Sequence, residues 1–134
     1  MLPRIAVLLA FVCAAASAQE LSYEVFKTKV QPIFLKKRPT HARCVVCHAG
    51  SNNSFRLQPL PKGATNWTEE QTRKNFETVS YLVIPGKPDE SHFLTQPLAQ
   101  SGGGELFHSG GRQFETKDDP DWKILADWVR AAKQ

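Results

Sequence analysis

Apolar residues recur at helical spacing along three segments of the chain, and each segment predicts an amphipathic helix. The first runs from Leu21 to Lys37, with Ser22 as its N-cap. Its apolar positions are Val25, Phe26, Val30, Ile33 and Phe34. Pro32 is expected to bend or divide this helix because proline has no backbone N–H to donate. Pro39 is expected to end it.

The second helix is expected to begin after Thr68, because Gln71 three residues on completes a capping box. Its apolar positions are Phe76, Val79, Leu82 and Val83, and Pro85-Gly86 is expected to end it. A shorter helix follows Ser91 and runs to Leu98, shortened or kinked by Pro97.

The last helix is expected to begin after Asp119, with Pro120 at its first position. Its predicted buried face consists of Trp122, Leu125, Trp128 and Val129. Polar loops rich in glycine and proline separate the helices, and no segment alternates in the manner of a β-strand. The predicted fold class is all-α, with the first and last helices packed on each other.

The N-terminus has the pattern of a secretory signal peptide. Arg4 precedes an apolar run from Ile5 to Ala16, and Ala16-Ser17-Ala18 is a cleavage site before Gln19. The run is shorter than the roughly 20 residues of a membrane span. Residues 1–18 are therefore predicted to be removed, leaving one domain over residues 19–134 in the periplasm or otherwise exported. Cys13 leaves with the signal, since the Val12 before it disfavours the alternative of a lipoprotein.

The segment Cys44-Val45-Val46-Cys47-His48 has the CxxCH spacing of covalent c-type haem attachment. The two thiols can add to the two vinyl groups of one porphyrin, and His48 can bind the iron as the proximal ligand. A thioredoxin-like pair would need a strand–helix–strand context, and a zinc site would need a second pair of ligands. A single CxxCH segment predicts one haem c.

The second axial ligand is constrained by the absence of a usable methionine, since Met1 is lost with the signal peptide. His41 is tied to the proximal side by its closeness to Cys44, and His92 lies at the start of a short helix. His108 lies in a glycine-rich segment that permits close backbone approach to a bulky cofactor. His108 is therefore the predicted distal ligand, with His92 or an open sixth position as the alternatives.

Other residues of the glycine-rich segment also suggest contacts with haem. Phe107 and Phe114 are expected to shield a haem face, and Arg112 is predicted to pair with a propionate.

The motif and its surroundings resemble class I-like monohaem cytochrome c domains, and more specifically the planctomycete-type cytochrome c domain. The matching segments are Val30-Gln31-Pro32-Ile33-Phe34, the CxxCH segment, Pro85-Gly86-Lys87-Pro88 with Ser91 and Leu94, His108-Ser109-Gly110-Gly111, and Leu125-Ala126-Asp127-Trp128-Val129. The resemblance covers most of the exported chain, with CxxCH as its most specific part. It implies a small helical domain wrapped around one covalent haem, and it implies that the residue corresponding to His108 is the second axial ligand.

Charge adds an expectation about partners. The formal net charge is +4, and six cations precede or flank the CxxCH segment, namely Lys27, Lys29, Lys36, Lys37, Arg38 and Arg43. They form either a positive rim that steers an acidic redox partner or an ordinary solvated helix face. Nothing resembles an interleaved basic and aromatic nucleic-acid surface.

The predicted function is one-electron transfer, by a free carrier or by an electron-transfer subunit of a membrane or periplasmic complex, and not catalysis on a small-molecule substrate. One alternative is a haem-based gas sensor or peroxidase-like enzyme with an open or exchangeable sixth position. Another is a mainly structural subunit whose haem relays electrons within a larger assembly.

Overall fold

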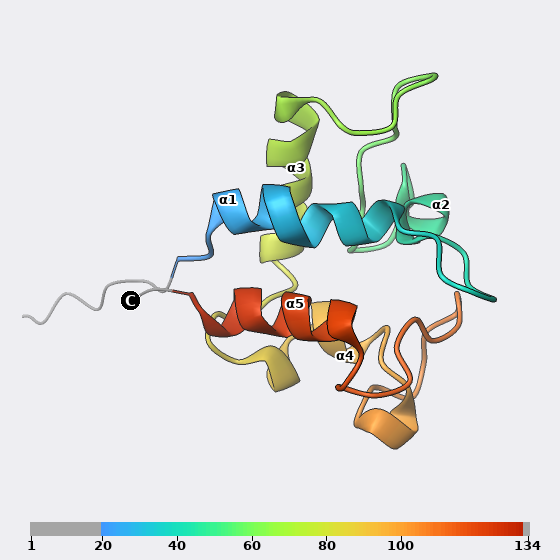
Figure 1. Ribbon diagram of the computed structural model, residues 1–134, viewed down its shortest axis with the longest axis vertical. Helices are drawn as coiled ribbons and strands as arrows, with labels where there is room; N and C mark the ends of the chain where they lie inside the picture. Colours follow the sequence, from blue (N-terminus) through green and yellow to red (C-terminus); the bar gives the residue numbers. More distant parts are fainter. Residues whose placement is uncertain (1–19, 133–134) are drawn as a thin grey trace, which may run out of the picture.

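In the computed structural model, which describes residues 20–132, the chain begins with one helical run whose hydrogen-bond pattern changes along its length (Figure 1). The run consists of α1 (Tyr23–Val25), a π-helical turn η1 (Phe26–Val30) and a 3₁₀ turn η2 (Gln31–Leu35). The Gln31 N–H donates to the Phe26 carbonyl, five residues back, directly before Pro32, which has no N–H. Pro32 is thus not a point of division, since the run stays helical through it and only the type of hydrogen bonding changes from π to 3₁₀ just before it. Ser22 caps the run by accepting from the Val25 N–H at 3.2 Å.

The CxxCH segment forms the short helix α2 (Cys44–His48), and α3 (Glu69–Ser80) follows after a long loop. The predicted capping box of α3 is present, with Thr68 Oγ1 accepting from the Gln71 N–H and Gln71 Oε1 accepting from the Thr68 N–H. The expected end at Pro85 is wrong. The helix ends at Ser80 because the next backbone N–H groups donate three residues back and tighten the chain.

The segment around Pro85-Gly86 forms a loop that is hydrogen-bonded to the last helix. Gly86 adopts a left-handed φ of 81° and donates its N–H to the Val129 carbonyl at 2.8 Å, which joins this loop to the last helix. The Ser91 hydroxyl accepts from the Ile84 N–H at 2.9 Å and donates to the Lys87 carbonyl at 2.7 Å, so it closes the loop. The short elements η3 (Pro88–Glu90), α4 (His92–Thr95) and η4 (Gln100–Gly102) follow, and α4 ends before the predicted Leu98.

The last helix, α5 (Pro120–Arg130), lies beside the first helical run and antiparallel to it (Figure 1). Asp119 caps α5 by accepting from the N–H groups of Asp121 and Trp122, as predicted. The predicted buried face is confirmed, since Trp122, Leu125, Trp128 and Val129 are all buried. Trp128 packs 5.6 Å from the Phe26 ring and donates its indole N–H to the Ser22 carbonyl at 2.9 Å. These contacts join the two ends of the domain.

The fold class is confirmed as a small all-α domain, because residues 20–132 contain several helices and no β-strand, only isolated β-bridges. None of the helices formed by these residues is long and apolar enough to cross a membrane. The predicted signal peptide, its cleavage site and Cys13 lie outside the described residues.

Candidate haem-binding site

A cavity of about 850 Å³ lies against α2 and is lined by residues from distant parts of the chain. This volume is within the range of about 300–1,000 Å³ that ligand and cofactor pockets have. Much of its wall is aromatic. Phe34, Phe55 and Phe93 contact one another edge to face, with ring centres 5.3–5.9 Å apart. The cavity is therefore suited to a large, flat and mostly apolar group.

Both predicted attachment cysteines line this cavity. They are one helical turn apart in α2, so their side chains share a face. Val45 between them is buried in the core, whereas Val46 is 62% exposed. Burial raises the pKa of the Cys44 thiol to about 11, while Cys47 is exposed. The burial of Val45 fixes α2 in the rotation that brings both sulfurs to the cavity.

His48 also lines the cavity, and its ring is oriented by the loop that follows α2. Its Nδ1 lies 2.8 Å from the Phe55 carbonyl oxygen and 3.2 Å from Asn53 Oδ1, both of which are acceptors. Burial lowers the pKa of His48 and so favours its neutral form. A hydrogen bond from Nδ1 to a carbonyl fixes the tautomer and leaves Nε2 as the nitrogen for a metal. The chemistry of His48 therefore fits a proximal ligand.

His108 is brought to the same cavity from a position 60 residues further along the chain. The centres of the His48 and His108 rings are 6.2 Å apart and their planes differ by 24°. Two imidazoles that each bind one metal through a nitrogen at about 2.0 Å would hold their ring centres roughly this far apart. Two thiols and two imidazoles at this spacing fit a covalently attached, bis-histidine haem.

The His108 ring is oriented by its own loop. Its Nδ1 hydrogen-bonds to the Gly111 carbonyl, and the Gly111 N–H donates to the His108 carbonyl at 3.0 Å. Gly111 has a left-handed φ of 81°, which glycine adopts without steric cost, so a glycine suits this position three residues after His108. As at His48, the Nδ1 bond leaves Nε2 available.

The other two histidines have different surroundings. His92 lines the cavity too, but its side chain is 71% exposed and its Nδ1 binds the Glu105 carboxylate at 2.6 Å. His41 Nδ1 lies 2.8 Å from the Pro39 carbonyl, and this residue is not part of the cavity wall. The ring that pairs with His48 is that of His108.

Arg112, the predicted partner of a propionate, is bonded to two backbone carbonyls. Its guanidinium donates to the carbonyl of Gln96 at 2.6 Å and to the carbonyl of Glu105, and it is not part of the cavity wall. Among the described residues that line the cavity, Arg43 is the arginine, and no lysine is present. From the sequence, Arg43 was expected only in the positive rim. Its position directly before Cys44 is the signal that could have placed it at the cavity.

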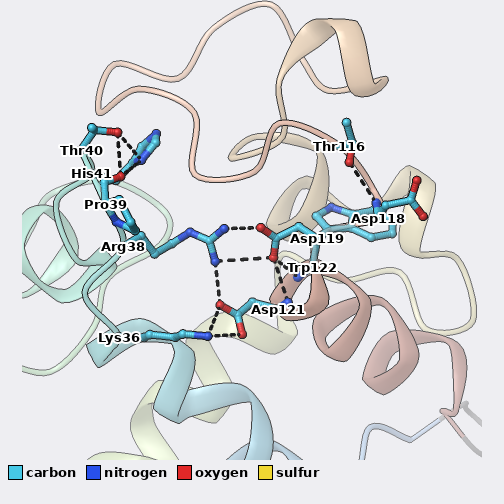
Figure 2. Close-up of polar contacts among 10 residues, drawn as sticks. All are labelled: Lys36, Arg38, Pro39, Thr40, His41, Thr116, Asp118, Asp119, Asp121 and Trp122. Atoms are coloured by element: carbon cyan, nitrogen blue, oxygen red, sulfur yellow. Dashed lines mark hydrogen bonds and ion pairs between the residues drawn. The ribbon is translucent and has the colours of Figure 1, made fainter.

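Lys36 and Arg38 hold the segment before α2 against the start of α5 (Figure 2). Arg38 bonds to both Asp119 and Asp121, and Lys36 lies 2.8 Å from Asp121. The Arg38 guanidinium also lies 4.9 Å from the centre of the Phe114 ring, which forms part of the cavity wall. These contacts fix the chain at the point where it enters the CxxCH helix.

These ion pairs also reduce the unbalanced charge of the predicted positive rim. Of the six cations predicted for it, Lys36 and Arg38 are paired with these carboxylates, and Lys27 is paired with Glu69 at 2.7 Å. Half of the rim is thus balanced by carboxylates of the same chain, which weakens the field that a partner would meet.

Replacement of Asp119 by Asn is expected to destabilise the protein by about 1.5–3 kcal/mol at pH 7, because a partly buried charged hydrogen bond is lost while an N-cap is kept. Burial alone raises the Asp119 pKa, but hydrogen bonds from Arg38 and from the N–H groups of Asp121 and Trp122 outweigh it and hold the pKa below its usual value. A depressed carboxyl pKa contributes stability above the unfolded value of about 3.9, and the contribution is lost as pH falls through the folded value. The difference between wild type and D119N in urea unfolding should therefore be largest above about pH 5 and shrink below pH 4.

The matched control is Asp118→Asn. The Asp118 side chain is 91% exposed in its pair with Lys123, so this change is expected to stay within about 0.5 kcal/mol at every pH. Equal pH profiles for D119N and wild type would contradict a stabilising role for the Asp119 charge.

Among residues 20–132, no group of three or more His, Cys, Asp or Glu side chains is arranged to hold a metal ion. Comparison of the chain with protein-family models, curated proteins and solved structures gave no match.

Proposed function

We propose that the chain is an exported monohaem c-type cytochrome that transfers one electron at a time. One haem c would be joined to Cys44 and Cys47, with His48 as proximal and His108 as distal ligand. The observation that carries the proposal is the pairing of the His48 and His108 rings, 6.2 Å apart, in the cavity that both cysteines line. The CxxCH spacing adds the means of covalent attachment.

When bound, the haem supplies an iron that cycles between Fe(III) and Fe(II). The chain's own residues would hold the ligands of that iron in fixed orientations. The Nδ1 atoms of His48 and His108 both bind backbone carbonyls, so neither ring turns easily. Phe34, Phe55 and Phe93 supply an apolar wall that limits the access of water. Fixed ligands and an apolar wall suit electron transfer, because few protein atoms have to move when the charge on the iron changes.

Bis-histidine ligation also bears on the redox potential. A His/Met pair raises the potential of a c-type haem, so a His/His pair gives a lower value in comparable surroundings. The protein would therefore donate electrons more readily than a His/Met cytochrome of similar burial.

The cavity opens toward exposed apolar residues that a redox partner would meet. Phe107 is 79% exposed and lines the cavity, and the adjacent Leu106 is 71% exposed. Arg43, which lines the same cavity as Phe107, contributes positive charge to its wall. We infer that a partner contacts this region through a small, partly apolar surface, with acidic residues opposite Arg43.

Optical and EPR spectra of the holoprotein, produced with its N-terminal segment in a host that attaches haem c, test the proposal. The expected result is one covalent haem per chain, with low-spin iron in both oxidation states and a ferrous spectrum that carbon monoxide leaves unchanged within minutes. High-spin iron, or rapid binding of carbon monoxide, would favour the gas-sensor or peroxidase-like alternative. Absence of covalent haem would overturn both.

A further inference from the structure

The loop that carries His108 is attached to α4 at two points, one on each side of the histidine. Glu105 lies three residues before His108 and Arg112 lies four residues after it. Both bind the segment from His92 to Gln96.

The Glu105 attachment consists of several hydrogen bonds. Its carboxylate accepts from His92 Nδ1 at 2.6 Å, from Thr95 Oγ1 at 2.5 Å and from the Gln96 side-chain amide. The Glu105 backbone N–H also donates to the Thr95 carbonyl at 3.0 Å. Burial alone would raise the pKa of Glu105, but the bonds from Thr95, His92 and Gln96 outweigh it and lower the pKa, so the carboxylate stays charged.

The Arg112 attachment closes the loop on its other side. One guanidinium nitrogen donates to the Gln96 carbonyl at 2.6 Å, and the other donates to the Glu105 carbonyl. Arg112 therefore bridges α4 and the first attachment point. The next residues continue along the same edge, since the N–H groups of Gln113 and Phe114 both donate to the Pro97 carbonyl.

Apolar burial contributes little to holding this loop. Leu106 and Phe107, its two large apolar residues, are 71% and 79% exposed. Gly110 and Gly111 add conformational freedom that has to be lost when the loop takes one shape. A segment with few buried apolar contacts opens locally at low cost unless polar contacts restrain it. The side-chain bonds of Glu105 and Arg112 add such restraints on both sides of His108, beside the backbone bonds of Glu105, Gln113 and Phe114.

We propose that Glu105 and Arg112 are positioning residues that hold His108 at the sixth iron position. The inference rests on the proposed function and adds the residues that set how long the distal ligand stays bound. Neither residue touches the iron. Each acts by keeping the loop against α4, so that the His108 ring stays 6.2 Å from that of His48.

The test uses the holoprotein and carbon monoxide as a probe of the open sixth position. Ferrous wild type, Glu105→Gln, Glu105→Ala and Arg112→Ala are mixed with carbon monoxide, and the rate of the spectral change is measured. Loss of charged hydrogen bonds is expected to raise the rate about tenfold or more in E105A and R112A. E105Q, which keeps one carbonyl acceptor, should fall between E105A and wild type. Glu115→Ala and Arg56→Ala change exposed residues of the same types outside these contacts and should match wild type.

Thermal unfolding and haem content of each variant separate positioning from a purely structural role. A lower melting temperature with a carbon monoxide rate within twofold of wild type would overturn the proposal. So would an equal acceleration in the E115A and R56A controls. If wild type itself binds carbon monoxide rapidly, the bis-histidine proposal fails, and the proposal that Glu105 and Arg112 position His108 fails as well. If wild type is low-spin and resists carbon monoxide but E105A and R112A do too, only the positioning inference fails.

Discussion

Serine at both Cys44 and Cys47 is expected to abolish covalent haem attachment completely. Each thiol forms one thioether bond in a c-type haem, and a hydroxyl does not replace a thiol in this addition. The two sulfurs belong to one helical turn and line one cavity, and residues 20–132 contain no third cysteine that could substitute. The measurement is the intact mass of the denatured, exported protein together with a haem stain after denaturing electrophoresis.

Single changes and a neighbouring control sharpen this result. Cys44→Ser and Cys47→Ser should each leave at most one thioether and a reduced yield of holoprotein. Val46→Ala lies between the two cysteines, but its side chain is 62% exposed, and this variant should keep the full haem mass. A haem that survives denaturation in the double serine variant would show that attachment occurs elsewhere, and the proposed function would be wrong.

Replacement of His108 by Ala is expected to convert the iron from low-spin to high-spin and to open the sixth position to carbon monoxide. An alanine methyl group provides no donor atom, and no methionine remains in the predicted exported chain to take its place. Binding of carbon monoxide should become faster by at least about a hundredfold, more than in the variants at Glu105 and Arg112, because the competing ligand is removed rather than loosened. EPR of the oxidised protein and stopped-flow mixing of the reduced protein give the two readouts.

The other histidines serve as matched controls for this change. His41→Ala alters a ring bound to the Pro39 carbonyl outside the cavity and should keep the wild-type spectrum. His92→Ala removes a ring that lines the cavity but is directed to Glu105, and it should stay low-spin. High-spin iron in H92A together with low-spin iron in H108A would assign the distal ligand to His92.

Features set by neighbouring residues could be predicted from the sequence. The capping box of Thr68 and Gln71 and the Asp119 cap each depend on contacts within a few residues. The CxxCH helix belongs to the same kind, since its spacing alone places both thiols on one face. The buried face of the last helix followed from its periodicity.

Features that depend on contacts between distant residues could not be predicted in this way. Phe55, Phe93 and Leu125 meet at one cavity only because the chain folds back on itself. Arg38 and Asp121 are 83 residues apart, and each alone looks like a surface charge. The predicted contact of Arg112 with a propionate rested on its charge and position, whereas its observed partners are two backbone carbonyls. Which carbonyls lack a helical partner is decided by the fold, not by local sequence.

The π-helical turn at Phe26–Val30 determines how the domain responds to a change in the length of its first helical run. A π turn accommodates one residue more than a regular helical turn, and each residue of an α-helix advances the side chains by about 100°. Loss of one residue from this turn would restore a regular helix and leave Ile33 and Phe34 directed at the cavity that they now line, because the wider π turn carries one more residue through nearly the same rotation. The run would still be helical and amphipathic. Its phase relative to the CxxCH helix would be kept, so a single-residue deletion inside this turn should be tolerated better than a deletion elsewhere in the run, which would rotate the following side chains by about 100°.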